Sequence, residues 1–258
     1  MELHGKVSNV TGGASGIGAA TCRAFAAAGA NVVVADVDGA GAANIADEIG
    51  GLAVPCDVGV ESAVDRLVRN TEAEFGPVDI FFSNAAIATG KGPLDTPIDA
   101  WSNQWQVNVM GHVFAVRAVL PSMLERKTGY LIHTASMAGI LTSHGNLPYA
   151  ATKHAVVGLA EWLSVTYHDK GIRVSLLAPL GVNTPMLNAA DSAFAQVAAG
   201  PIKEPEEVAA QVVNAVTNEH FLILTDPVAQ TWMERKTNDP ERWLKGMRRM
   251  QAKIDGIR

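Results

Sequence analysis

Short apolar runs alternate with segments of helical length along most of the chain. The runs that suit buried strands lie at 6–10, 31–35, 51–55, 78–83, 130–134, 172–178 and 220–225. The helical segments lie at 16–28, 60–74, 99–127, 149–169 and 204–218. Strands and helices in alternation form parallel sheets through right-handed crossovers. We therefore expect an α/β fold, a single-domain Rossmann-type doubly wound parallel sheet with helices on both faces, spanning residues 1–258.

Two stretches depart from this alternation. Residues 185–204 are irregular, and long irregular loops in compact domains often bind ligands, so we interpret them as a substrate-loop region. Residues 226–258 form a predicted helical tail with an apolar face at roughly helical spacing. That face comprises Trp232, Met233, Trp243, Leu244, Met247 and Met250. We expect it to pack on the core or across a dimer interface; a direct role over the substrate pocket is the alternative.

One polar residue conflicts with its predicted strand. Asn9 lies in the run 6–10, where a central strand of a parallel sheet is normally apolar. A buried amide without a partner costs about 1–3 kcal/mol. We therefore expect a hydrogen-bond partner near Asn9.

Composition narrows the classes of function. The formal net charge is −6 and basic residues are not clustered, which argues against nucleic-acid binding. No apolar span reaches the roughly 20 residues of a membrane helix. The segment 1–6 lacks a secretory-signal pattern, so we expect no membrane association and a cytoplasmic location. Cys22 and Cys56 are too few for a disulfide framework, and no Cys/His cluster indicates a metal site, so both thiols should be buried.

A glycine-rich turn follows the first strand, with the sequence Thr11-Gly12-Gly13-Ala14-Ser15-Gly16-Ile17-Gly18. Glycines let the backbone approach a dinucleotide, and the next helix N-terminus attracts its phosphates. Asp36 ends the second strand, where a carboxylate binds the ribose hydroxyls of NAD and repels the extra phosphate of NADP. No Lys or Arg offsets that repulsion, so we predict NAD. An ordinary glycine turn and a solvated acid are the alternatives.

A second motif lies at Tyr149-Ala150-Ala151-Thr152-Lys153. Residues four apart share a helix face, so the phenol and the ammonium should point into one site. A phenol with an ordinary pKa of about 10 is a poor base at neutral pH, but a nearby cation favours its ionised form. Tyr149 and Lys153 are therefore a predicted acid–base pair, and an incidental helical spacing is the alternative.

Together these motifs resemble the short-chain dehydrogenase/reductase family over residues 5–185. Three further segments, 56–58, 83–86 and 179–184, resemble its cofactor motifs in the expected order. Ala86 and Leu180 replace family glycines, and we expect Leu180 to shift its loop or weaken the hold on nicotinamide. The resemblance implies a cofactor site formed by Gly12, Ser15, Gly16, Ile17, Gly18, Asp36, Asp57, Val58, Asn84, Ala85, Ala86, Tyr149, Lys153, Pro179, Val182 and Thr184.

The same resemblance implies four catalytic residues: Asn108, Ser136, Tyr149 and Lys153. Tyr149 would exchange the proton of the substrate hydroxyl, and Ser136 would hold the substrate oxygen. Lys153 would lower the pKa of Tyr149 and bind the nicotinamide ribose, while Asn108 would anchor a water that relays protons. Hydride passes directly between nicotinamide and substrate carbon, so no metal is needed.

The predicted substrate pocket lies between segments 87–96, 137–147 and 185–200. Side chains expected to line it are Ile87, Met137, Ile140, Leu141, His144, Met186, Leu187 and Phe194. Their apolar character, without an arginine for a carboxylate or phosphate, favours a hydrophobic alcohol or ketone. His144 is the strongest polar candidate, although a lone histidine is more often a surface or satisfied core residue.

The sequence thus predicts an enzyme that transfers hydride between NAD and a hydrophobic secondary alcohol/ketone pair. An NADPH-dependent carbonyl reductase and a dinucleotide-binding regulator or scaffold with little turnover are the alternatives. Family members usually pair through helices corresponding to 105–127 and 149–169, which implies a homodimer or homotetramer.

Overall fold

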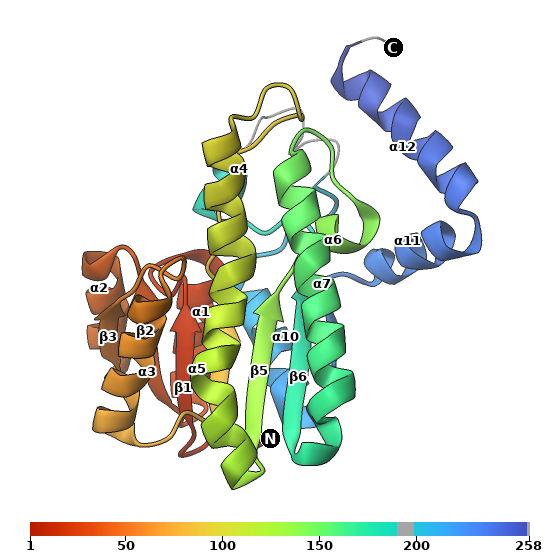
Figure 1. Cartoon of the computed structure of the whole chain (residues 1–258). Coiled ribbons are helices and arrows are strands. Elements are labelled where there is room, and N and C mark those ends of the chain that lie inside the picture. The colour runs from red at the N-terminus through yellow and green to blue at the C-terminus, as the bar shows by residue number, and fades with distance from the viewer. Residues whose placement is uncertain (190–198, 257–258) are drawn as a thin grey trace.

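The computed structural model describes residues 1–189 and 199–256. Its centre is a parallel sheet with strand order β3-β2-β1-β4-β5-β6-β7 (Figure 1). The strands are β1 (Val7–Thr11), β2 (Asn31–Asp36), β3 (Leu52–Pro55), β4 (Ile80–Ser83), β5 (Gly129–Thr134), β6 (Ile172–Ala178) and β7 (Leu222–Leu224). The order changes direction between β1 and β4, as in doubly wound sheets. The predicted fold class is therefore confirmed.

Helices cover both faces of this sheet. One layer contains α1 (Gly16–Ala27), α2 (Gly39–Ile49) and α10 (Pro205–Asn218). The other contains α3 (Glu61–Phe75), α5 (Gly111–Arg126) and α7 (Leu147–Tyr167), followed by the short η2 (His168–Lys170). Successive residues of β2 alternate between the layers, because Val33 packs in one core while Val32 and Val34 pack in the other.

Helix α2 was missing from the sequence prediction. The Asp38 side chain accepts a hydrogen bond from the Gly41 amide and so caps its first turn. Ala42, Ile45 and Ala46 are buried, and their spacing is the helical period that the sequence already contained.

The predicted single helix 99–127 consists of three segments. These are α4 (Ile98–Trp105), the π-helical turn η1 (Gln106–Met110) and α5. Among the described residues, the run Ile98–Arg126 alone is long and apolar enough to span a membrane, but 56% of its most apolar window is buried, as in a core helix. The π turn is the local departure that carries Asn108, and such turns are frequent at functional sites.

The remaining helices lie near the carboxyl ends of the strands. They are α6 (Ala138–Leu141), α8 (Pro185–Asn188), α11 (Pro227–Asn238) and α12 (Pro240–Ile254). The last two form the predicted helical tail. Trp232, Met233 and Trp243 pack on the apolar cluster that contains Met137 and Leu141, so this part of the tail packs on the core as expected. Leu244 of the same predicted face is 43% exposed.

The buried polar residue of β1 has the expected partner. Asn9 Oδ1 accepts a hydrogen bond of 2.9 Å from Thr71 Oγ1 on α3, while Asn9 Nδ2 has no partner among the described residues. Cys22 and Cys56 are buried free thiols, as predicted. Burial raises the pKa of Cys22 to about 12 and that of Cys56 to about 11, which leaves both unreactive at neutral pH.

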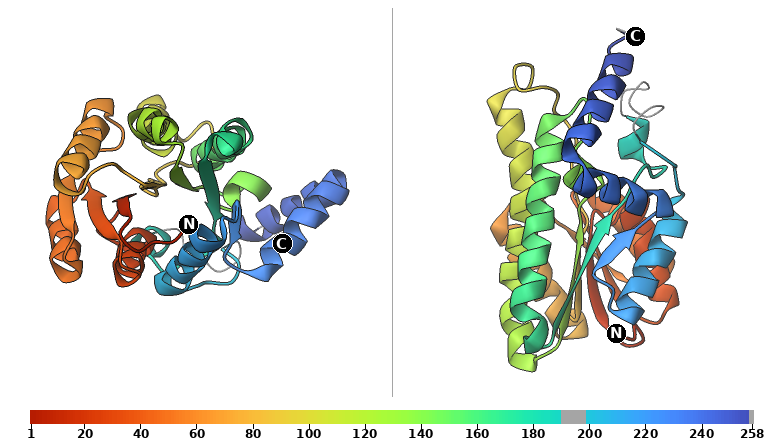
Figure 2. Two further views of the ribbon diagram at one scale, coloured as in Figure 1. Left: turned by 90° about the horizontal axis from the view of Figure 1, so that it is seen from below. Right: turned by 90° about the vertical axis from the view of Figure 1, so that its right-hand side faces the viewer.

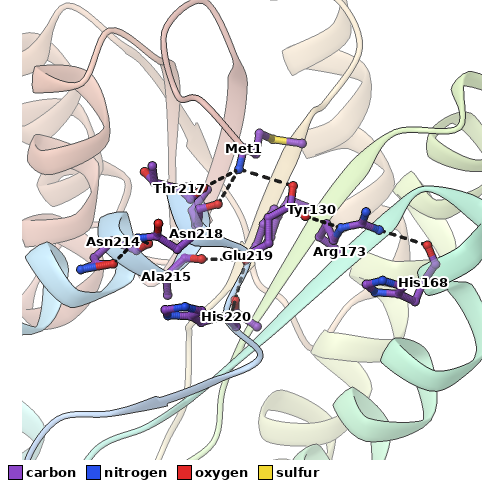
Figure 3. Close-up of polar contacts among 12 residues, drawn as sticks. Met1, Tyr130, His168, Arg173, Asn214, Ala215, Thr217, Asn218, Glu219 and His220 are labelled. Carbon is purple, nitrogen blue, oxygen red and sulfur yellow. Dashed lines mark hydrogen bonds and ion pairs between the residues drawn. The ribbon is translucent and has the colours of Figure 1, made fainter.

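A network of polar contacts lies at the amino ends of β5, β6 and β7, opposite the carboxyl ends that carry the predicted site (Figure 3). The Met1 ammonium donates to the Val216 carbonyl at 2.7 Å and lies 3.5 Å from a Glu219 carboxylate oxygen. Glu219 also pairs with Arg173 of β6. Beside them the Tyr130 hydroxyl lies 2.8 Å from Ser175 Oγ. These contacts fix α10 and β7 at the end of the sheet away from the predicted site.

Candidate active site

The glycine-rich turn connects β1 to α1 and packs tightly against its own backbone. A Cβ on Gly18 would lie 1.9 Å from the Gly12 carbonyl oxygen, so no other residue fits at position 18. Gly12 has a φ of +66°, and a Cβ there would lie 2.9 Å from Ala85 Cα. Ser15 is the exposed N-cap of α1, and its side chain makes no capping hydrogen bond. The positive end of α1 is therefore available to a phosphate group.

Asp36 ends β2 beside this turn. Its Oδ2 accepts from the Ala14 amide and its Oδ1 from the Asp38 amide, each at 3.0 Å. The carboxylate is thus held in place by two backbone groups. Asp57, after β3, is exposed and accepts from the Gly59 amide at 2.9 Å, while Val58 is buried.

Asn84 connects three strands at their carboxyl ends. Its Nδ2 donates to the Thr11 carbonyl at 3.1 Å, and its Oδ1 accepts from Thr134 Oγ1 at 3.1 Å. The backbone amides of Asn84 and Ala85 both donate to Thr11 Oγ1. Asn84 therefore links the glycine turn after β1 to the end of β5, where the catalytic residues begin.

Asn108 holds the segment that follows β4. Its Oδ1 accepts from the Ile87 amide and its Nδ2 donates to the Ile87 carbonyl, both at 2.8 Å. Nδ2 also lies 3.2 Å from Thr152 Oγ1. The side chain is thus occupied by protein partners, and the water-anchoring role implied for Asn108 stays a prediction. Gln104, which the sequence analysis missed, acts in the same way through a 2.8 Å bond from the Thr89 amide.

Ser136, Tyr149 and Lys153 converge after β5. The Lys153 ammonium nitrogen lies 5.6 Å from the centroid of the Tyr149 ring, so the two residues share a helix face as predicted. Lys153 is fully buried and donates to the Thr134 carbonyl at 2.8 Å. Ser136 Oγ accepts from the Ala138 amide at 3.1 Å. Strand β5 and helix α7 therefore assemble the predicted catalytic set.

Burial dominates the proton affinities of this set. It lowers the pKa of Lys153 to about 7. It raises the pKa of Tyr149, and a hydrogen-bonding contribution from Ser136 opposes that rise only in part. In the protein alone, Tyr149 is therefore protonated at neutral pH. The lowering of the Tyr149 pKa by Lys153, which the resemblance implied, stays a prediction.

Two buried histidines, one on α5 and one on β5, form a pair that was not predicted. The Nδ1 atoms of His112 and His133 are 2.9 Å apart, and both side chains are buried. One Nδ1 must donate and the other accept, so at least the accepting ring is neutral. Burial lowers the pKa of His133 to about 4, and it also holds the pKa of His112 well below its ordinary value. His112 lies one helical turn after Asn108, and that spacing is the signal that could have found it.

The segment after β6 reaches the glycine turn. The Thr184 side chain lies against Gly16, and its Oγ1 caps α8 by accepting from the Leu187 amide. Leu180 turns into the apolar cluster that contains Trp232. A tail side chain thus accommodates the leucine that replaces the family glycine, and any effect on the nicotinamide stays a prediction.

Three of the predicted substrate residues lie in one apolar cluster, and the others lie outside it. Met137, Ile140 and Leu141 pack in the cluster with the tail. Met186 is 40% exposed, and Ile87 is held by its backbone. His144 is buried and contacts Gln251 of α12. Phe194 lies outside the described residues. His154 is exposed and contacts the carbonyl of Ala150 in its own helix, as expected for a surface histidine.

Comparisons with known proteins agree with this geometry. Residues 6–194 match the short chain dehydrogenase family. A 2,5-dichloro-2,5-cyclohexadiene-1,4-diol dehydrogenase of Sphingobium indicum is 42% identical over 193 residues, covering 73% of this chain and 77% of that protein. A 1-deoxy-11-beta-hydroxypentalenate dehydrogenase of Streptomyces exfoliatus is 34% identical, covering 93% and 90%. A short chain dehydrogenase/reductase of Burkholderia phymatum, solved with NAD, has a TM-score of 0.85 at 29% identity, covering 93% and 96%.

The chain belongs to the short chain dehydrogenase family. It is an oxidoreductase that acts on CH–OH groups with a nicotinamide dinucleotide. The glycine turn, the open end of α1 and Asp36 fit such a cofactor, because they offer backbone amides to its phosphates and a carboxylate to its ribose.

Proposed function

We propose that this enzyme is an NAD-dependent dehydrogenase that transfers hydride between nicotinamide and a hydrophobic secondary alcohol or its ketone. The convergence of Ser136, Tyr149 and Lys153 at the end of β5 carries the proposal. Asn84 ties that point to the glycine turn, so cofactor and substrate would meet there.

The protonation state of Tyr149 determines which direction of the reaction it can assist. A protonated Tyr149 can donate to a ketone oxygen held by Ser136. Alcohol oxidation needs the opposite transfer, which requires Tyr149 to have lost its proton. Because burial raises the pKa of Tyr149, oxidation should accelerate as the pH rises above 7, while ketone reduction should not. When bound, the cofactor accepts or supplies the hydride.

Asp36 supports NAD as the cofactor. Two backbone amides hold its carboxylate at the end of β2, so it cannot swing away from an additional ribose phosphate without losing both bonds. Like charge at that position costs binding free energy for NADP. The NAD in the related structure from Burkholderia phymatum supports the same choice.

Apolar surroundings support the substrate class. Met137, Ile140 and Leu141 follow Ser136 directly and lie in an apolar cluster. The names of the Sphingobium and Streptomyces relatives specify cyclic alcohols as their substrates. We therefore place alicyclic secondary alcohols first.

The deciding experiment incubates the purified protein with aliphatic, alicyclic and aromatic secondary alcohols and follows the absorbance of reduced nicotinamide, with NAD and NADP in parallel. Turnover with NAD is expected. Tyr149→Phe should abolish it and retain NAD binding. A preference for NADP would overturn the cofactor proposal. Silence across the panel, with NAD still raising the melting temperature, would favour a dinucleotide-binding regulator.

We also propose that the chain forms a homodimer or homotetramer through α5 and α7. The exposed apolar side chains Trp162 and Val165 on α7, which are 58% and 87% exposed, support a covered face. Val165→Glu should lower the mass measured by sedimentation equilibrium. An unchanged oligomer would place the contact elsewhere.

A further inference from the structure

We infer that α12 completes the substrate site and selects hydrophobic alcohols that carry a second hydroxyl group. Through Gln251, the helix holds His144 so that Nε2 of His144 accepts a hydrogen bond from that hydroxyl. The inference rests on the proposed function, because it concerns the substrate of the same site.

A chain of hydrogen bonds links the end of the tail to the segment between Ser136 and Tyr149. Gln251 Nε2 donates to Asp255 Oδ1 at 2.8 Å, one helical turn further along the tail. Gln251 Oε1 lies 2.7 Å from His144 Nδ1, which is 107 positions away in the sequence. His144 lies between α6 and α7, after the catalytic Ser136 and before Tyr149.

These partners determine which nitrogen of His144 carries the proton. The Asp255 carboxylate only accepts, so the Gln251 amide nitrogen must face it and the amide oxygen must face His144. An amide oxygen also only accepts, so His144 Nδ1 must be the donor. In the neutral ring Nε2 then carries a lone pair and no proton. The tail thus fixes Nε2 of His144 as an acceptor.

That acceptor is buried and unused. His144 is 8% exposed, and its Nε2 has no hydrogen-bond partner within residues 1–189 and 199–256. A buried nitrogen without a donor is unfavourable, and a substrate O–H would satisfy it. A monofunctional alcohol uses its single hydroxyl at Ser136 and Tyr149 and leaves Nε2 unsatisfied.

The apolar part of the tail faces the same region. Trp243 of α12 packs with Met137 and Leu141, which follow Ser136. The Lys236 ammonium of α11 donates to the Ile140 carbonyl. In Figures 1 and 2, α12 stands beyond the carboxyl ends of the strands, at the end of the sheet where the site lies. No residue of α12 is buried, so its half-covered face offers apolar surface to the carbon skeleton of a substrate.

The kinetic test uses NAD and four substrates: cyclohexanol and cyclohexane-1,2-, 1,3- and 1,4-diol. The measured quantity is the ratio of kcat/KM for each diol to kcat/KM for cyclohexanol. At least one diol should exceed cyclohexanol in the wild type, mainly through a lower KM. Gln251→Ala and His144→Phe should reduce that ratio roughly 3- to 15-fold, the range for one lost hydrogen bond. Gln230→Ala is the matched control, because the side chain of this exposed tail glutamine donates to Glu234 and contacts no residue of the site in the described part of the chain. An unchanged ratio in both test variants would overturn the inference.

A second readout does not depend on turnover. Nitrogen-15 NMR of labelled histidines, assigned by the signal lost in His144→Phe, should show Nδ1 protonated in the wild type and a mixture of tautomers in Gln251→Ala. Calorimetric titration of the same diols into the protein with NADH should show binding that His144→Phe weakens. Diol binding without turnover would refute the proposed function alone, whereas turnover with a His144 protonated on Nε2 would refute the inference alone.

Discussion

The cofactor side and the substrate side of this enzyme are built by different means. On the cofactor side, Gly12, Gly18 and Asn84 pack backbone close to backbone, where the turn after β1 meets the segment after β4. On the substrate side, Met137 and His144 contact tail residues about a hundred positions away. The first side depends on close backbone packing at the strand ends of the sheet, and the second depends on side chains of the helical tail.

This difference explains how each side tolerates change. A backbone-lined turn has no room for a side chain, whereas a side-chain cluster can exchange one apolar residue for another. Leu180 illustrates the second case, because a residue that departs from the family pattern is absorbed by Trp232 of the tail.

Gly18→Ala should have the largest effect of the changes considered. Its new methyl group would lie 1.9 Å from the Gly12 carbonyl oxygen, and both atoms belong to backbone that cannot move independently. We expect a loss of about 4 kcal/mol or more in the free energy of unfolding, and loss of NAD binding. Urea denaturation and NAD titration measure the two effects. Near-normal NAD affinity would show that the turn is adaptable.

Lys153→Met should abolish activity and raise the free energy of unfolding. The folded pKa of Lys153 is about 7 against an ordinary value of 10.5, so the folded protein binds fewer protons between these pH values. Stability of the wild type therefore rises with pH across that window, and the cost of burying the ammonium is fully present below pH 7. The variant should be inactive and about 1–3 kcal/mol more stable at pH 6.

The stability gain of Lys153→Met should shrink as the pH approaches 10. Denaturation curves at pH 6 and pH 10 test this, with Lys170→Met on the surface as the control. A gain independent of pH would mean that Lys153 is not buried as a charge.

Most of the fold could be predicted from the sequence because each buried strand is an apolar run between helical periods. Helix α2 was missed although Ala42, Ile45 and Ala46 have helical spacing. The π turn at Asn108 could not be predicted, since one extra residue in a helical turn leaves the apolar pattern almost unchanged.

The convergence of Tyr149 and Lys153 was predictable because the two residues lie four positions apart in one helix. The actual environment of Lys153 was not, since it depends on Thr134 and on the burial that α7 receives from β5. The pairing of His112 with His133 joins a helix to a strand, and no spacing rule connects such positions. His144 was predicted as a polar contact, but its partner Gln251 is visible only when the tail is folded back.

Leu180→Gly should lower the free energy of unfolding through the substrate side and leave the cofactor side unchanged. The leucine side chain packs beside Gly200 and Trp232, so its loss should cost about 2 kcal/mol of unfolding free energy. NAD affinity should change less than about twofold, a shift well below 1 kcal/mol, because the side chain packs in the apolar cluster with the tail. Denaturation and NAD titration provide both numbers. A clear gain in NAD affinity would show instead that Leu180 weakens the hold on nicotinamide.

Thr71→Val should have the smallest effect and none on catalysis. The Thr71 hydroxyl serves Asn9 Oδ1 in the core below the cofactor side, away from every residue of the site. Its removal leaves a buried amide oxygen without a donor, which should cost about 1–2 kcal/mol while kcat and KM stay unchanged. Thr71→Ser keeps the hydroxyl and is the control.

Because an unsatisfied polar group costs more than a pair replaced together, Asn9→Leu combined with Thr71→Val should regain most of the lost stability. A double variant less stable than either single one would show that Asn9 has a further role that its unpartnered Nδ2 serves.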